Sequence, residues 1–119
     1  MAVIRLEDKA EEQSTYAVKA EFFDHDGTAV TPTTVQWTLK DSLHNDVINE
    51  RSAVSVTPAS LIYIVMSGDD LALTAEEEAG LLPGERFLSI YAVYNSVDLG
   101  NSLPLRKECV FEIENEGNV

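Results

Sequence analysis

Three stretches of this sequence alternate apolar and polar residues with a period of two, and this pattern constrains the fold more than any other feature. Successive side chains of a β-strand point to opposite faces, so each stretch predicts a strand with one face in a core. The predicted inward residues are Tyr16, Val18, Ala20 and Phe22 in TYAVKAEFF, Val35, Trp37 and Leu39 in TVQWTLK, and Cys109, Phe111 and Ile113 in KECVFEIE.

Further strands are expected where apolar residues run together or alternate briefly. SLIYIVM and RFLSIYAVY are apolar on both faces, which is typical of central strands or of strands at an interface. VIRLE and AVSVT (53–57) are shorter candidates, and DVINE is a candidate edge strand. About seven strands without alternating helices predict an all-β fold, a sandwich of two sheets.

Helix signals are confined to one segment, TAEEEAG. Thr74 is placed as an N-cap, Glu77 stands three residues later as in a capping box, and Gly80 can end the turn. The segment predicts one short helical turn between two strands.

The chain of 119 residues has the length of one domain, predicted over 1–119 with its core at about 14–115 and an N-terminal extra strand or arm. The start turns charged after four residues and lacks the apolar core of a signal peptide, so we expect synthesis in a cytoplasm. LIYIVM is too short to span a bilayer. The single cysteine, Cys109, excludes an internal disulfide and is expected to be buried in a strand.

A formal net charge of −13 disfavours binding to nucleic acid and to anionic membrane surfaces, because both carry negative charge. Two interpretations of the charge stay open. It can serve as a solvated surface that keeps the protein soluble, or as an acidic face that fits a basic partner.

The two aspartate pairs are the candidate ion-binding sites of the sequence. Aligning FFDHDGTAV to a calcium loop puts Phe22 and Thr33 at positions that need oxygen-bearing acidic ligands, so a tight turn with Gly27 at positive φ is the favoured interpretation. Asp69 and Asp70 fit turn and capping roles better than an ion site, although ion binding stays open. Without a nucleophile elbow or a phosphate loop, we expect no catalytic residue, no cofactor and no metal.

Three features of the sequence bear on whether the protein has a binding surface. Trp37 is expected in the core. LIYIVM is either core or, at an edge or outer face, an interface for a partner. Tyr63, Tyr91 and Tyr94 would form a sugar-binding face if they pointed outward together.

The ordered strands resemble those of immunoglobulin-like and fibronectin type III-like sandwiches, with LLPGERFLSIYAVYN similar to the entry into a sixth strand and VQWTL similar to a tryptophan strand. FFDHDGTAVTPTTVQWTL, followed by VIN, IVMSGDDLAL, YAVYNS and CVFEIEN, resembles small Ig-like structural proteins of tailed bacteriophages and prophages. This resemblance implies a non-enzymatic virion component of the capsid surface, neck or tail, assembled in a bacterial host cytoplasm. Its partners would be other virion proteins or copies of itself, and a homo-oligomer is conceivable. The alternative function is an Ig-like module that binds carbohydrate or a cell surface.

Overall fold

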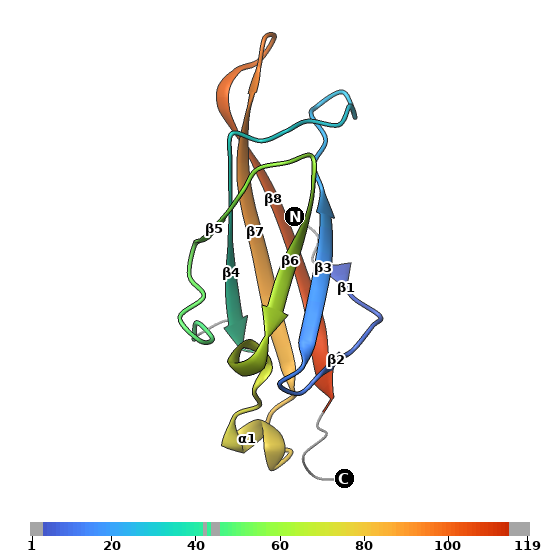
Figure 1. The fold of residues 1–119 in the computed structure, drawn as a ribbon, viewed down its shortest axis with the longest axis vertical. Helices are drawn as coiled ribbons and strands as arrows, with labels where there is room; N and C mark the ends of the chain where they lie inside the picture. Colours follow the sequence, from blue (N-terminus) through green and yellow to red (C-terminus); the bar gives the residue numbers. More distant parts are fainter. Residues whose placement is uncertain (1–3, 42, 44–45, 115–119) are drawn as a thin grey trace.

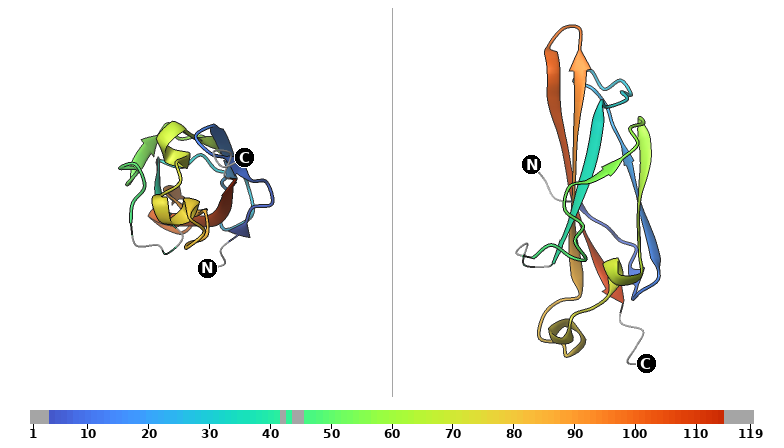
Figure 2. Two further views of the ribbon diagram at one scale, coloured as in Figure 1. Left: turned by 90° about the horizontal axis from the view of Figure 1, so that it is seen from below. Right: turned by 60° about the vertical axis from the view of Figure 1, so that its left-hand side comes forward.

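Two β-sheets pack face to face in the computed structural model, which describes residues 4–41, 43 and 46–114. The predicted all-β sandwich is thereby confirmed. The molecule is elongated, with principal extents of 54 × 23 × 23 Å (Figure 1). The right-hand view of Figure 2 shows the two layers side by side, with β3 and β6 on one side and β4, β7 and β8 on the other.

The large sheet has the order β1-β8-β7-β4-β5, and β2 also pairs with β8. Among the described residues, the small sheet consists of β3 and β6, which run antiparallel. β1 and β2 run parallel to β8 and cover its outer edge. The strands are β1 (Ile4–Arg5), β2 (Ala10–Glu11), β3 (Thr15–Glu21), β4 (Thr34–Asp41), β5 (Val54–Val56), β6 (Leu61–Ser67), β7 (Glu85–Ser96) and β8 (Gly100–Glu114).

The core lies where the alternating strands predict it. β4 turns Val35, Trp37 and Leu39 inward, and β8 turns Cys109, Phe111 and Ile113 inward, all 7% exposed or less. The register sets Trp37 opposite Ile90 of β7 and Leu39 opposite Leu88, so apolar side chains of neighbouring strands meet on the inner face of the large sheet. From β3, Val18 and Ala20 are buried, while Tyr16 is half-buried and stacks on Phe111 with 4.7 Å between ring centroids.

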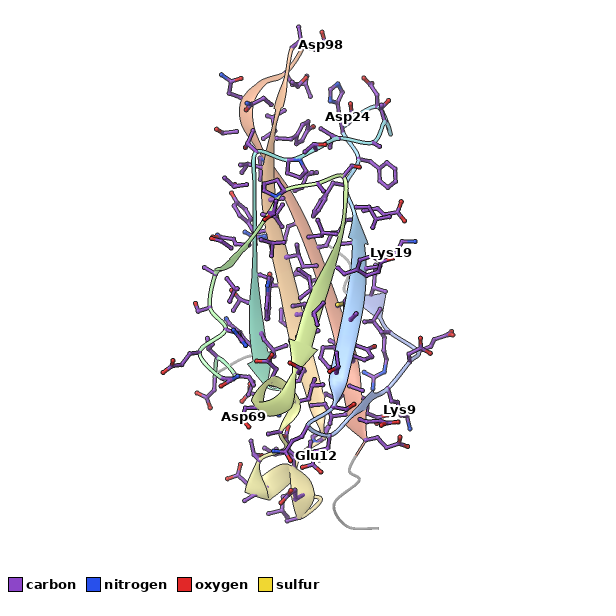
Figure 3. The ribbon with its side chains drawn as sticks, viewed as in Figure 1. Lys9, Glu12, Lys19, Asp24, Asp69 and Asp98 are labelled. Carbon is purple, nitrogen blue, oxygen red and sulfur yellow. The ribbon has the colours of Figure 1, made fainter. Side chains whose placement is uncertain are left out.

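β7 is a central strand, as one interpretation of its doubly apolar sequence predicts, because β4 and β8 pair with it on either side. Together β7 and β8 form a long hairpin whose turn extends beyond the other strands at the top of Figure 1. Asp98 marks that turn in Figure 3, and the neighbouring Val97 is fully exposed.

Two short segments differ from the expectation. DVINE forms no strand: only Val47 makes a single bridge, to Lys40. Asn49 and Glu50 adopt positive φ angles of 51° and 58°, which end an extended chain. In the opposite sense, Ala10–Glu11 forms strand β2 although two residues are too few to show a periodic pattern.

The segment between β6 and β7 carries the helical turns, η1 (Gly68–Leu71) and α1 (Ala75–Glu78). α1 forms where the capping pattern predicts it. The Thr74 side chain accepts from the Glu77 N–H at 3.2 Å, and the Glu77 carboxylate accepts from the Thr74 N–H at 2.9 Å. Gly80 follows with a φ of 79°, a conformation that suits glycine.

A buried ion pair attaches α1 to the sheet. Arg86 of β7 donates to both carboxylate oxygens of Glu77, at 2.7 and 3.1 Å, and also to the carbonyls of Ala72 and Glu85. The two charged side chains are 0% and 2% exposed. The connection between the sheets is therefore held by a bidentate pair that water does not reach.

Candidate interaction surface

β6 is half core and half surface: the core interpretation of LIYIVM holds for one face, and the other face is exposed. Ile62, Ile64 and Met66 point inward and are 6% exposed or less. The outward residues of β6 are Leu61, Tyr63 and Val65, which are 41%, 57% and 56% exposed. The outer face of the small sheet thus presents a row of three apolar or aromatic side chains to solvent.

The backbone of these outward residues is also free on one side. In an antiparallel pair, hydrogen-bonded and non-hydrogen-bonded residue pairs alternate. The Phe22 N–H donates to the Ser60 carbonyl at 2.9 Å at one end, and the Gly68 N–H donates to the Ser14 carbonyl at 3.1 Å at the other. Since the pattern alternates between these two hydrogen-bonded end pairs, the core-facing residues of β6 are the ones whose backbone groups bond to β3. The N–H and C=O groups of the outward residues therefore point away from β3.

We call this side of β6, with the backbone groups of Leu61, Tyr63 and Val65, the open edge. β6 pairs with β3 alone, and across residues 4–41, 43 and 46–114 no backbone hydrogen bond from another segment reaches these three residues. An edge of this kind is able to accept a further strand.

The open edge ends at Ser67, whose N–H donates to Asp70 Oδ2 at 3.1 Å. The other oxygen of Asp70 accepts from Arg51 Nε at 2.7 Å and from Asn49 Nδ2 at 2.8 Å. Burial alone would raise the pKa of Asp70, but the hydrogen bonds from Arg51, Asn49 and Ser67 outweigh it and lower the pKa. Asp70 thus fixes η1 and the end of β6, with its oxygens engaged by protein donors. Asp69 belongs to η1 and is exposed (Figure 3).

The stretch of sequence that holds the open edge lacks charged residues. The run from Ser52 to Gly68 contains no Asp, Glu, Lys or Arg and is the longest such run in the sequence. It holds both β5 and β6. On the other strand of the small sheet, β3, Lys19 and Glu21 form an exposed ion pair at 3.4 Å. Charged residues at an edge discourage strand pairing between molecules, and the β6 edge has none.

The three tyrosines do not share a face. Tyr63 lies on the outer face of the small sheet, whereas Tyr94 is buried, with its hydroxyl 3.5 Å from His25 Nδ1. Tyr91 lies on the outer face of the large sheet, where the guanidinium of Arg106 sits 5.5 Å from its ring centroid. Tyr91 borders a shallow hollow whose other lining residues are Gln36, Thr38, Lys40, Phe87, Ser89, Arg106 and Glu108.

The turn at Asp24 is held by hydrogen bonds between the Asp24 side chain and backbone N–H groups of the turn. The Asp24 carboxylate accepts from the N–H groups of Asp26 and Thr28 at 2.9 and 3.0 Å, and Gly27 has a φ of 81°, as the turn interpretation predicts. Ligand atoms of Asp24, His25 and Asp26 lie within 4.8 Å of one another, but exposed acidic groups commonly gather without an ion. His44, the other histidine, lies outside the described residues.

Cys109 is 7% exposed, as expected for a strand thiol, and burial raises its pKa to about 11. Such a thiol stays protonated at neutral pH and is a poor nucleophile.

Sequence reasoning missed Arg86 and Arg51. Both pair with carboxylates in the β6–β7 connection, and pairs formed across unrelated segments leave no periodic signal. The capping box around Glu77 was the only sequence feature that pointed to such a pair, because a capping glutamate uses one carboxylate oxygen and leaves the other in need of a donor.

No helix in the described part of the chain is long and apolar enough to cross a membrane. Comparison with protein-family models, curated proteins and solved structures found no match.

Proposed function

We propose that this chain is a non-enzymatic structural or accessory protein of a phage particle, on the capsid surface, neck or tail, and works through protein–protein contacts. The observation that carries the proposal is the open edge of β6. It combines free backbone groups with exposed Leu61, Tyr63 and Val65 in an otherwise acidic protein. The assignment to a virion, assembled in a bacterial cytoplasm, is supported by the resemblance of the strand motifs to Ig-like phage proteins.

The test is to fractionate particles released by the organism that encodes this chain on a density gradient and to search the fractions by mass spectrometry. We expect the protein to migrate with assembled particles. Its recovery only at the top of the gradient, away from particles, would refute the virion assignment.

The role of the open edge is tested in the same gradient with a tagged Tyr63→Lys chain. A lysine at the centre of the edge should prevent incorporation, whereas the matched Ala17→Lys chain carries the same charge on β3 and should be incorporated. Equal incorporation of both variants would show that the particle contact lies elsewhere.

A second candidate function is sugar binding at the hollow beside Tyr91. Tyr91 and Arg106 form an aromatic and cationic platform there, and Gln36, Thr38 and Ser89 supply polar groups around it. The carbohydrate-binding alternative drawn from the sequence would then use one tyrosine of the three. A glycan array tests this function: wild-type binding that Tyr91→Ala abolishes and Tyr63→Ala preserves would support it, and an array without any bound glycan would exclude it for the sugars tested.

A further inference from the structure

The hydrogen-bond pattern of the open edge specifies how a strand can be added to it. Backbone groups of Leu61, Tyr63 and Val65 point outward from the edge, while the Ser67 N–H is already engaged by Asp70 at 3.1 Å. An added strand can therefore form hydrogen bonds along three residues and must end before Ser67. Tyr63 lies at the centre of this segment.

We propose that the strand added at this edge is β6 of a second copy of the chain, paired antiparallel about a two-fold axis at Tyr63. The inference deepens the proposed function and rests on it. Leu61 would then lie opposite Val65 of the second copy, and Tyr63 opposite Tyr63. All three are hydrogen-bonded pairs that use only free backbone groups. The two small sheets would become one four-stranded sheet in the order β3-β6-β6-β3.

The capping of Ser67 limits the register on its C-terminal side. Moving the two-fold axis by one residue toward the C-terminus would set Leu61 opposite Ser67 and would require the Ser67 N–H that Asp70 holds. The register at Tyr63 avoids this conflict. It also matches aliphatic Leu61 with aliphatic Val65 and stacks one tyrosine beside another, which are favourable cross-strand pairs.

The β6 edge is where two copies of this acidic chain meet with the least charge repulsion. Two molecules of net charge −13 repel each other wherever their acidic surfaces meet. The run from Ser52 to Gly68 is the longest stretch without a charged residue, and β6 lies within it. Contact through the β6 edges brings uncharged segments together, and an isologous contact needs only one self-complementary surface. A two-stranded sheet also gains support from additional strands.

The first experiment is sedimentation equilibrium of the purified full chain from micromolar to millimolar concentration. We expect a monomer–dimer equilibrium that added NaCl strengthens, because salt screens the repulsion between two acidic molecules. Tyr63→Lys should weaken dimerisation at least about tenfold, since it places two like charges opposite each other. Ala17→Lys adds the same charge to β3, so its effect should be smaller. A wild-type chain that stays monomeric at millimolar concentration would overturn the proposal.

The second experiment tests the register by disulfide formation. Directly opposed residues of a hydrogen-bonded pair have Cα atoms about 5.5 Å apart, within the range that a disulfide spans. Tyr63→Cys should therefore cross-link two chains under mild oxidation. Val65→Cys should not, because Val65 lies opposite Leu61. The native Cys109 is buried and does not compete. Dimers in which Val65→Cys cross-links and Tyr63→Cys does not would refute this register.

The outcomes separate this inference from the proposed function. A chain that migrates with particles but remains a monomer would retain the proposed function and lose the second copy as the partner, leaving a strand of another protein as the occupant. A chain that dimerises through Tyr63 but is absent from particles would keep the second copy as the partner and lose the proposed function.

Discussion

Two carboxylate–guanidinium pairs hold the connection between β6 and β7, and water reaches only one of them. In the pair of Glu77 and Arg86, both side chains are 2% exposed or less. In the pair of Asp70 and Arg51, the Asp70 side chain is 1% exposed but the Arg51 side chain is 40% exposed. Both pairs join a carboxylate to a guanidinium, but they differ in what remains after one partner is removed. Arg51 can turn to water without its carboxylate, whereas Arg86 cannot.

The largest effect on stability is expected for Trp37, whose ring lies beneath Arg51 of the half-exposed pair. Trp37 is 5% exposed, and Arg51 lies 5.9 Å from its ring centroid. Trp37→Ala should lower the free energy of unfolding by about 3–5 kcal/mol, because it empties a core site that its neighbours cannot refill. Urea denaturation measures this change. A loss below about 1 kcal/mol would contradict the core role and would favour a binding role for Trp37.

Breaking the buried pair should rank next. Glu77→Ala leaves the guanidinium of Arg86 in the interior with only the carbonyls of Ala72 and Glu85 as acceptors. We expect a loss of about 3 kcal/mol in unfolding free energy, at the lower end for a buried charge that loses its partner. The double variant Glu77→Leu/Arg86→Met is the control, since it removes both charges and should recover much of the loss. A single variant as stable as wild type would show that the pair is not needed.

The half-exposed pair should matter less and should depend on pH. Asp70→Asn keeps the shape of the side chain but removes its charge, and we expect a loss of about 1–2 kcal/mol at pH 7. Because the folded-state pKa of Asp70 is lowered, its stabilisation is present above the ordinary carboxyl pKa of about 3.9 and disappears as the pH falls through the lower folded value. The difference between wild type and Asp70→Asn should therefore shrink at low pH. An unchanged difference between pH 7 and pH 2 would contradict this assignment.

The smallest effect is expected for a pair that is exposed on both sides. Lys19 and Glu21 are 53% and 45% exposed. Lys19→Gln should change the unfolding free energy by less than about 1 kcal/mol, because solvent screens such pairs. Thermal denaturation at low and high salt checks this. If Lys19→Gln lowered the unfolding free energy as much as Asp70→Asn does, solvent access would not explain the order of these effects.

The parts of the structure that follow a local pattern were predictable from the sequence. Strand faces such as Val35, Trp37 and Leu39 follow from the period of two, and α1 follows from Thr74 and Glu77. The failure at DVINE has a local cause as well, since positive φ angles at Asn49 and Glu50 do not appear in a hydrophobicity pattern.

The candidate site was only partly predictable. The doubly apolar sequence of β6 is the same for a central strand and for an edge strand with an apolar outer face, so strand order had to be known. The dispersed tyrosines show the same limit. Tyr91 and Tyr94 are three residues apart and therefore lie on opposite faces of β7, while Tyr63 is in the other sheet.

The position of Trp37 makes the molecule its own optical probe. It is the single tryptophan, it is buried in the large sheet, and the guanidinium of Arg51 lies above its ring. Its emission should be that of an indole shielded from water and should shift to the red when the sandwich opens. Because Trp37 lies in the large sheet and Tyr63 in the small one, this fluorescence follows the opening of the sandwich without a label.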